Sequence, residues 1–329
     1  MRCFGFIFAL AWAASAAVDG VVTNQTTGKP QGGVVVTLVE LGTAMNNIGS
    51  VTTSADGKFT FPSTLKPGAP HLIQAQHQGV NYNRMLPPGT PSAGLSVDVF
   101  NASPSVPDAQ VSQDMFLLEP TGTEVIISER IIYNNTSKLT YLDPEGSIKI
   151  YVPKGVTGPV QVRIQAPQGM PITRPAEKGK SENLYVVRYP IKPGETNVDV
   201  GYSLPMSNNQ AKFEGKILHP GGPIRFVAPS GVKLEGPFED GGPIPGTTAT
   251  AYTLKGREYA ITVSGTGSLR ASAQNRGDGE GETGPPIEAR KPLIYERLPW
   301  VLSLTFAMLA VGFAMLWRRT APVRPGGKR

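Results

Sequence analysis

Residues 34–41 read VVVTLVEL and residues 95–99 read LSVDV, and these two runs decide the fold class. The first run is rich in β-branched residues, which fit the pleated and half-buried surface of a sheet. In the second run, leucine and valine alternate with serine and aspartate, which predicts a strand with one buried and one wet side. Similar short runs recur between clusters of Gly, Pro, Asn and Asp, and the chain between its two ends has almost no helical periodicity. The sequence therefore predicts an all-β protein.

The amount of turn-forming residues supports the same fold class. The 329 residues include 38 glycines and 31 prolines, about a fifth of the chain against an average of roughly 12%. This content is too high for a protein of long helices. Collagen is excluded because glycine does not recur at every third position. The chain is also too rich in valine, leucine, isoleucine and tyrosine for wholesale disorder. Short strands separated by such turns are typical of β-sandwiches.

A tight turn at Asp56-Gly57 separates two candidate strands, residues 50–53 and 58–61. Asp-Gly favours the type I′ turn that joins two antiparallel strands, so we expect a hairpin here. The second strand carries two phenylalanines that are two residues apart, and side chains with this spacing share one face of a strand. We expect this face to point into the core.

Three blocks of strands follow one another along the chain, at residues 18–100, 113–205 and 208–269. The candidate strands of the second block are 124–128, 130–133, 147–152, 160–164, 184–189 and 197–202. Those of the third block are 211–218, 223–228, 248–254 and 259–264. We expect two or three tandem β-sandwich modules of the immunoglobulin or transthyretin type. The third block is expected to lean on the second, because about 60 residues bury too little surface alone.

Five segments of the first block carry a resemblance to a known family. They are residues 19–22 (DGVV), 27–30 (TGKP), 32–38 (GGVVVTL), 56–61 (DGKFTF) and 65–68 (LKPG). Together they resemble the carboxypeptidase regulatory-like domain, a transthyretin-like sandwich also called a carbohydrate-binding-like fold. The resemblance implies a fold for about a quarter of the chain and implies almost nothing about activity. In this pattern, glycine at 32 or 33 lets the chain enter the next strand where a side chain would clash.

The N-terminal residues 1–17 read MRCFGFIFALAWAASAA, which predicts a secretory signal peptide. One arginine precedes a short apolar run, and Ala14-Ser15-Ala16 fits the small-residue pattern at which such peptides are cleaved. The alternative is an uncleaved N-terminal anchor, for which the apolar run is short. The only cysteine of the chain is Cys3, so a cleaved protein would contain no disulfide and no thiol nucleophile. A cysteine-free exported body is more typical of bacteria than of eukaryotes.

Residues 298–317 form an apolar stretch without a charge, flanked by tryptophans near both ends. Twenty residues at 1.5 Å each match the hydrocarbon thickness of a bilayer, so we expect one transmembrane helix rather than a buried core helix. The basic tail, residues 318–329, is then cytoplasmic by the positive-inside rule. Residues 271–292 have the composition of a flexible stalk. These segments predict a bacterial inner-membrane protein with a single span and an extracytoplasmic body.

The charge of the body excludes nucleic acid as a partner. The formal net charge is +6, and Arg2 with the five basic residues of the tail accounts for all of it. The remaining chain is neutral, whereas nucleic-acid binding needs a clustered basic face. The membrane and a protein or glycan of the envelope are the partners that we expect.

The sequence offers no recognisable catalytic pattern. The HExxH pair of zinc peptidases, the GxSxG elbow of hydrolases and the phosphate-binding glycine loops are all missing. The three histidines are His71, His77 and His219; the first two lie six residues apart, and we expect them to be polar surface residues. We therefore predict no catalytic, cofactor-binding or metal-ligating residue, no cofactor and no enzyme. A hydrolase using His71 or His219 is the least favoured alternative.

The expected function is the binding or scaffolding of another envelope component by extracytoplasmic sandwich modules. Loops at the ends of sandwiches are the usual binding surfaces in such folds. The loops to inspect are residues 42–50, 83–94, 165–183 and 236–246. The alternative is a carbohydrate-binding protein. For it, the tyrosines that could stack on sugars, or equally pack in the core, are Tyr82, Tyr133, Tyr141, Tyr151, Tyr185 and Tyr189.

Overall fold

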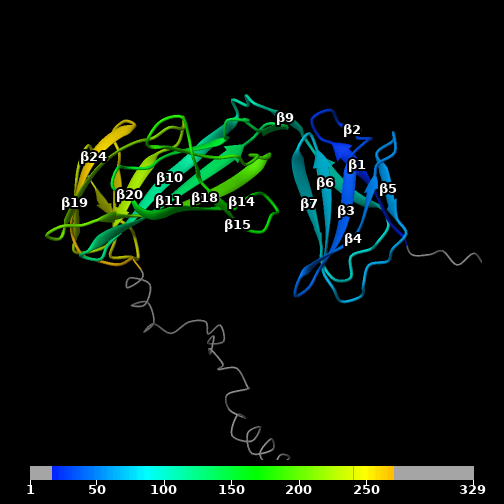
Figure 1. The fold of residues 1–329 in the computed structure, drawn as a ribbon, viewed down its shortest axis with the longest axis horizontal. Coiled ribbons are helices and arrows are strands. Elements are labelled where there is room, and N and C mark those ends of the chain that lie inside the picture. The colour runs from blue at the N-terminus through cyan, green and yellow to red at the C-terminus, as the bar shows by residue number, and fades with distance from the viewer. Residues whose placement is uncertain (1–16, 240, 270–329) are drawn as a thin grey trace, which may run out of the picture. The chain divides into compact units, whose positions relative to one another are not determined.

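The computed structural model describes residues 17–239 and 241–269, and in these residues the chain is all-β, as the sequence predicts (Figure 1). Strands β1 to β24 form six sheets, and the described part contains no helix that could cross a membrane. The predicted stalk, span and basic tail lie outside the described residues, as do residues 1–16 of the predicted signal peptide.

The first eight strands form the N-terminal module, which consists of two four-stranded sheets. The strands are β1 (Val18–Asn24), β2 (Lys29–Pro30), β3 (Val35–Leu41), β4 (Met45–Thr52), β5 (Lys58–Phe61), β6 (His71–His77), β7 (Val80–Leu86) and β8 (Leu95–Val99). One sheet has the order β2-β1-β5, with β8 parallel to β1, and the other has the order β4-β3-β6-β7. Both sheets contribute to one hydrophobic core, which makes the module sandwich-like.

The alternation in β8 places its leucine and valines in this core and its serine and aspartate in solvent, which confirms the prediction for this strand. Phe59 and Phe61 share the buried face of β5, with their ring centroids 5.9 Å apart. Gly32 has no room for a side chain, because a Cβ there would lie 2.8 Å from the carbonyl oxygen of Ser54. Close approach of backbone is thus the reason for a glycine at this point of the chain.

The predicted hairpin at Asp56-Gly57 is wrong. Strand β4 pairs with β3, whereas β5 pairs with β1, so the turn connects the two sheets of the module instead of two neighbouring strands. Only Gly57 has a positive φ, of 75°, whereas a type I′ turn needs positive φ at both central residues. The turn is closed by the Gly57 amide, which donates to the Ser54 carbonyl at 2.9 Å.

Gly20 lies at the most crowded point of the module, where β1 runs between β5 and β8. A Cβ at this position would lie 2.2 Å from the carbonyl oxygen of Leu95 and 2.6 Å from the ring of Phe59. The first of these contacts is with backbone, which cannot rotate away. The close pairing of β1 with β8 therefore requires glycine here.

Strands from the second and third predicted blocks join in one second module. Its large sheet has eight strands, in the order β15-β14-β18-β11-β10-β20-β23-β22. These strands are β10 (Ala109–Pro120), β11 (Glu124–Asn135), β14 (Thr157–Gln165), β15 (Ile172–Pro175), β18 (Gly194–Pro205), β20 (Ile224–Ala228), β22 (Gly242–Pro243) and β23 (Thr250–Thr253). Since β20, β22 and β23 come from the third block, the two blocks share a sheet.

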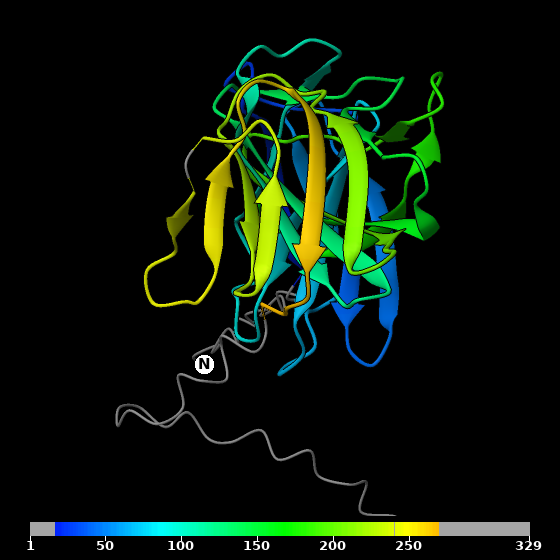
Figure 2. The ribbon, with the colours of Figure 1, turned by 90° about the vertical axis from the view of Figure 1, so that its left-hand side faces the viewer.

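Two three-stranded sheets, β13-β17-β16 and β19-β24-β21, pack with the large sheet in a single core. Their strands are β13 (Ile148–Tyr151), β16 (Glu177–Lys178), β17 (Leu184–Val187), β19 (Gln210–Lys216), β21 (Val232–Glu235) and β24 (Glu258–Gly265). Figure 2 shows β19 in lime green beside β24 in orange. The core includes the stacked rings of Phe116 and Phe226, 4.5 Å apart, against which Tyr259 packs edge-on.

Several sequence predictions need correction. Neither β10 nor β21 was predicted as a strand. Residues 124–128 and 130–133 belong to one continuous strand, β11. All four segments expected as loops contain strand residues, which are part of β4 in 42–50, the end of β7 in 83–94, β15 and β16 in 165–183, and β22 in 236–246.

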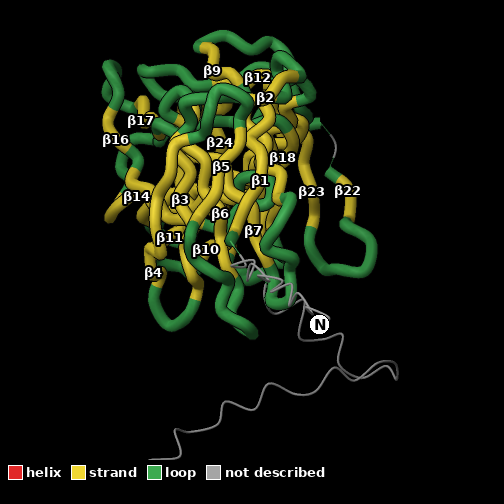
Figure 3. Tube along the Cα trace, turned by 90° about the vertical axis from the view of Figure 1, so that its right-hand side faces the viewer, coloured by secondary structure: helices red, strands yellow, loops and turns green. Residues whose placement is uncertain are grey.

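A pair of short strands joins the two modules. Strand β9 (Asn101–Ser103) follows β8, and it pairs parallel with β12 (Leu139–Tyr141) of the second module; both are labelled in Figure 3. Leu142 extends this contact by packing against the core of the N-terminal module. We call the contacts between the two modules the seam.

Candidate functional site

Two of the four segments that were predicted as binding loops line a cavity of about 330 Å³ at the seam, although the residues from 83–94 that do so lie in strand β7 and not in a loop. Asn83 and Arg84 line it from the N-terminal module, and Pro167 and Gln168 line it from the second module. Lys192 completes the wall on the second-module side. The loops at 42–50 and 236–246 do not line this cavity. We call this space the seam cavity and consider it the candidate binding site.

Tyr82 anchors the seam cavity, and its hydroxyl links the two modules. The ring is 4% exposed, and the hydroxyl lies 2.8 Å from the Phe100 carbonyl, to which it donates. It also lies 2.8 Å from the hydroxyl of Thr140 in the second module, whose side chain is fully buried. Since the Tyr82 proton is given to the carbonyl, Thr140 is the donor in the second bond. Burial raises the pKa of the Tyr82 phenol.

Lys192 reaches across the seam without an acidic partner among the described residues. Its Nζ lies 5.2 Å from the centroid of the Tyr82 ring and donates to the carbonyl of Asn81. The ring face attracts the ammonium group through its quadrupole, but it does not neutralise the charge. Burial therefore lowers the pKa of Lys192 to about 8. An amine with this pKa is partly neutral in weakly alkaline solution.

The burial of the Lys192 amine can be measured directly by its titration. In the protein dimethylated with ¹³C-formaldehyde, we expect one lysine signal with a midpoint near pH 8, whereas exposed lysines titrate near 10.4. The signal should disappear in Lys192→Arg and remain in Lys154→Arg, since Lys154 is exposed. A spectrum in which every lysine titrates above pH 10 would contradict the burial of this amine.

Removal of the Tyr82 hydroxyl is expected to weaken the seam. Tyr82→Phe leaves the Phe100 carbonyl and the buried Thr140 hydroxyl without their bonds, which costs about 1–3 kcal/mol of unfolding free energy for each such group. Urea unfolding of both modules, together with the rate of chymotryptic cleavage after Phe100 at the junction between them, measures the change. The matched control is Tyr185→Phe, because the described residues give the Tyr185 hydroxyl no hydrogen bond; equal stability of the two variants would contradict the prediction.

The histidines do not gather in one place. His71 and His77 lie at opposite ends of β6, and His219 follows β19 in the second module. The expectation that His71 and His77 are surface residues is wrong for His71, which is 1% exposed and accepts a hydrogen bond from the Lys66 amide at 3.3 Å. His77 is partly exposed and lies 3.1 Å from the Asn101 side chain.

A buried polar cluster in the second module was missed by the sequence analysis. His219 Nε2 lies 3.0 Å from Asp114 Oδ2, and the two side chains are 7% and 0% exposed. Glu129 faces the same core from β11, opposite Phe116, and Asp114 is its diagonal neighbour on β10. Within the described residues, the Glu129 carboxyl has no hydrogen bond and no cation. Burial, together with the nearby Asp114, raises the pKa of Glu129 well above its usual range.

The tyrosines do not form one sugar-binding platform. Tyr82 belongs to the N-terminal module, and Tyr133 is buried in the core of the second. Tyr141, Tyr185 and Tyr189 are partly buried and pack against that core. The described residues contain no group of three His, Cys, Asp or Glu side chains that could hold a metal ion. The seam cavity thus remains the place where predicted loops and an aromatic side chain come together.

Comparisons with known proteins identify no family for the chain. No protein-family model matches it, and neither does any curated protein. Among solved structures, an M1 zinc metallopeptidase from Deinococcus radiodurans is 12% identical with a TM-score of 0.23, over 47% of this chain and 42% of that one. A mutant of that enzyme with a Tyr-Ser-Ala substrate is 11% identical with a TM-score of 0.24, over 49% and 44%. This chain therefore covers less than half the length of either, and scores this low do not establish a shared fold.

Proposed function

We propose that this chain is a non-enzymatic, membrane-anchored protein of the bacterial envelope whose extracytoplasmic modules bind or scaffold another envelope component. The observation that supports binding is the seam cavity, which lies between the two modules and is lined by Tyr82, Lys192 and Gln168. Cavities between modules and loops on a rigid scaffold are frequent binding sites. The anchoring rests on the sequence of residues 1–17 and 298–317.

A photo-crosslinking amino acid at Gln168 tests the binding function. Gln168 is exposed at the rim of the seam cavity, so its side chain can be changed without disturbing the core. In intact cells carrying the full chain, we expect a discrete crosslinked partner from Gln168. The same amino acid at Lys233, which is exposed on β21, should give none. Identical products from both positions, or none from Gln168, would reject the seam cavity as the binding site.

The anchoring and orientation have their own test. Protease added to spheroplasts is expected to cut the stalk at 271–292, because segments without a core to protect them are the preferred sites of cleavage. A soluble fragment of roughly 250–270 residues should be released, while the tail 318–329 stays protected. Digestion of the tail before the body would reverse the orientation and with it the extracytoplasmic location.

Glycan binding is the second candidate function. The seam cavity combines the partly exposed ring of Phe100 with the polar side chains of Asn83, Asp98 and Gln168. An aromatic ring beside amides and a carboxylate is able to stack on a sugar and bind its hydroxyls. If the partner is a glycan, the detergent-solubilised full chain should be retained on peptidoglycan, and Asp98→Ala should reduce the retention. Unchanged retention of Asp98→Ala would argue against a sugar in this cavity.

A further inference from the structure

A second cavity, of about 330 Å³, lies beside His219 in the second module. Its lining contains two cationic or protonatable groups, Lys149 and His219, and no aspartate or glutamate. Hydroxyl donors are supplied by Tyr133, Tyr141 and Ser147, while several prolines provide apolar surface. A cavity rich in donors and free of acids has the chemistry that an anionic oxygen ligand requires. We call it the His219 cavity.

Asp114 orients the imidazole of His219 from behind the cavity wall. Asp114 Oδ2 lies 3.0 Å from His219 Nε2, and neither His219 Nδ1 nor Asp114 Oδ1 has a hydrogen-bond partner in the described residues. Burial raises the pKa of Asp114, although the hydrogen bond from His219 opposes the effect. The pair carries a hydrogen on Nδ1 when the imidazole is protonated, or when Asp114 itself holds the shared proton on Oδ2. In these two states Nδ1 is a buried donor without an acceptor, whereas in a neutral imidazole with its proton on Nε2 it carries no hydrogen; an anionic ligand selects the donor states.

The backbone around His219 is fixed as well. Arg257, which precedes β24, donates to the His219 carbonyl and to the Gly221 carbonyl, the second at 3.2 Å. These bonds hold the segment between β19 and β20 against the rest of the module. The orientation of His219 is therefore set by its side chain and its backbone together, as expected of a preformed binding wall.

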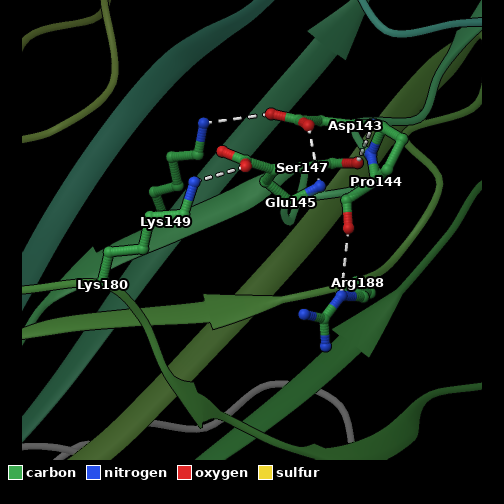
Figure 4. A network of polar contacts seen from close by, with 7 residues as sticks. All are labelled: Asp143, Pro144, Glu145, Ser147, Lys149, Lys180 and Arg188. Atoms are coloured by element: carbon green, nitrogen blue, oxygen red, sulfur yellow. Dashed lines mark hydrogen bonds and ion pairs between the residues drawn. The ribbon is translucent and has the colours of Figure 1, made fainter.

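The opposite wall is built on the turn at Asp143, which Figure 4 shows in detail. Asp143 accepts a hydrogen bond from Lys149 Nζ at 3.0 Å, and its own amide donates to the Ser147 hydroxyl oxygen at 3.0 Å. The Glu145 amide donates to Asp143 at 2.9 Å, and Arg188 donates to the Pro144 carbonyl at 3.1 Å. The turn thus places Ser147 and Lys149 side by side on the cavity wall without consuming the hydroxyl proton of Ser147.

We propose that the His219 cavity binds a small organic carboxylate. Asp143 already pairs with Lys149 and Asp114 with His219, so the lining offers hydrogen-bond donors without a large excess of positive charge. A ligand with one negative charge fits these donors, and an apolar body fits the prolines and tyrosine rings. The carboxylate would accept hydrogen bonds from His219 Nδ1, Lys149 Nζ and the neighbouring hydroxyls, which gives the buried Nδ1 the acceptor that it lacks. This inference goes beyond the proposed function, because it assigns a class of ligand to the His219 cavity, which shares no lining residue with the seam cavity.

The test uses the full chain in an uncharged detergent and measures benzoate binding by calorimetry. We expect benzoate to bind with a Kd below about 1 mM, and benzamide, which has the same shape without the charge, to bind at least tenfold more weakly. Inorganic phosphate should not displace benzoate at equal concentration. Equal binding of benzoate and benzamide, or no binding of benzoate, would overturn the proposal, and displacement by phosphate would reject its selectivity for carboxylates.

Matched lysine variants locate the site. Lys149→Met should weaken benzoate binding about tenfold, since a charged hydrogen bond of about 1.4 kcal/mol is lost. Lys154→Met removes an ion pair with Glu182 outside this cavity and should change the affinity less than twofold. Both lysines are on the surface, with side chains 42% and 74% exposed, so the module should fold in both variants. Equal effects of the two substitutions would place the ligand elsewhere.

Discussion

Replacement of Glu129 by glutamine is expected to stabilise the second module at pH 8 by on the order of 2 kcal/mol or more. Glu129 occupies an inward position of β11 between Ile127 and Ile131, and the described residues provide no cation to balance its charge. Its diagonal neighbour Asp114 adds a second buried carboxyl. Burial and this neighbour raise the pKa of Glu129 well above the usual range of a glutamate. Glutamine keeps the shape of the side chain and removes the charge.

The direction of the pH dependence follows from the raised pKa. In the unfolded chain Glu129 releases its proton near pH 4.5, whereas in the folded module it holds the proton to higher pH. The stability that depends on this proton is fully present below pH 4.5 and is lost as the pH rises toward the folded pKa, by up to about 1.4 kcal/mol per pH unit. The advantage of Glu129→Gln should therefore vanish at pH 4 and grow toward pH 8.

Denaturant unfolding at several pH values between 4 and 9 measures this effect. Glu214→Gln is the control, because Glu214 is an exposed residue of β19 and its substitution should leave the unfolding free energy within about 0.5 kcal/mol. The hydroxyls of Tyr202, Tyr133 and Tyr259 also face the cluster, but a phenol is neutral over this pH range and burial raises its pKa further. A Glu129→Gln variant that is less stable than the parent at pH 8 would show that the carboxylate has a partner in solution.

Introduction of a single methyl group at Gly20 is expected to destabilise the N-terminal module by about 3 kcal/mol or more. The Cβ of Gly20→Ala would lie 2.2 Å from the carbonyl oxygen of Leu95, well inside van der Waals contact. Either β1 separates from β8, with loss of their backbone hydrogen bonds, or the ring of Phe59 is displaced from the core. Both routes disrupt the sheet that contains β1, β5 and β8.

Gly201→Ala in β18 is the control for this substitution. Gly201 also lies inside a strand, has no positive φ, and has nothing within 4 Å of an added Cβ. Alanine there should change the unfolding free energy by less than about 1 kcal/mol. Hydrogen exchange of the β1 and β8 amides provides the readout for the N-terminal module alone. Protection in Gly20→Ala equal to that of the parent would show that the two strands can move apart at little cost.

Polar residues at inward positions explain why the strands of the second module were predicted less well than β8. The sequence predicts two strands, 124–128 and 130–133, where the structure has the single strand β11. The prediction ends the first strand before Glu129 because a glutamate within an alternating apolar run indicates the end of a strand. Strand β10 was not predicted as a strand; Asp114 stands at one of its inward positions, and a bulge between Val111 and Gln113 also shifts the alternation. Alternation predicts a strand only where the buried face is apolar.

Pairing between distant segments accounts for the other differences. The Asp56-Gly57 turn was recognised from local residues, but the partner strands of β4 and β5 are set by long-range packing. The four segments suggested as binding surfaces followed from the prediction of sandwiches. Residues from two of these segments, 83–94 and 165–183, line the seam cavity. The sequence could not bring Asp114 and His219 together, since they are 105 residues apart and belong to different predicted blocks.

The parallel pairing of β10 with β20 has a consequence for the order in which the chain can fold. All eight strands of the N-terminal module have been synthesised once Val99 is made, so this module can close early. The large sheet must wait for β20, about 110 residues after β10, and contacts of such separation form slowly. Until then Asp114 and Glu129 are in contact with water and ionised at neutral pH. Closure of the core therefore raises the pKa of both carboxyls at this late step, after the N-terminal module has formed.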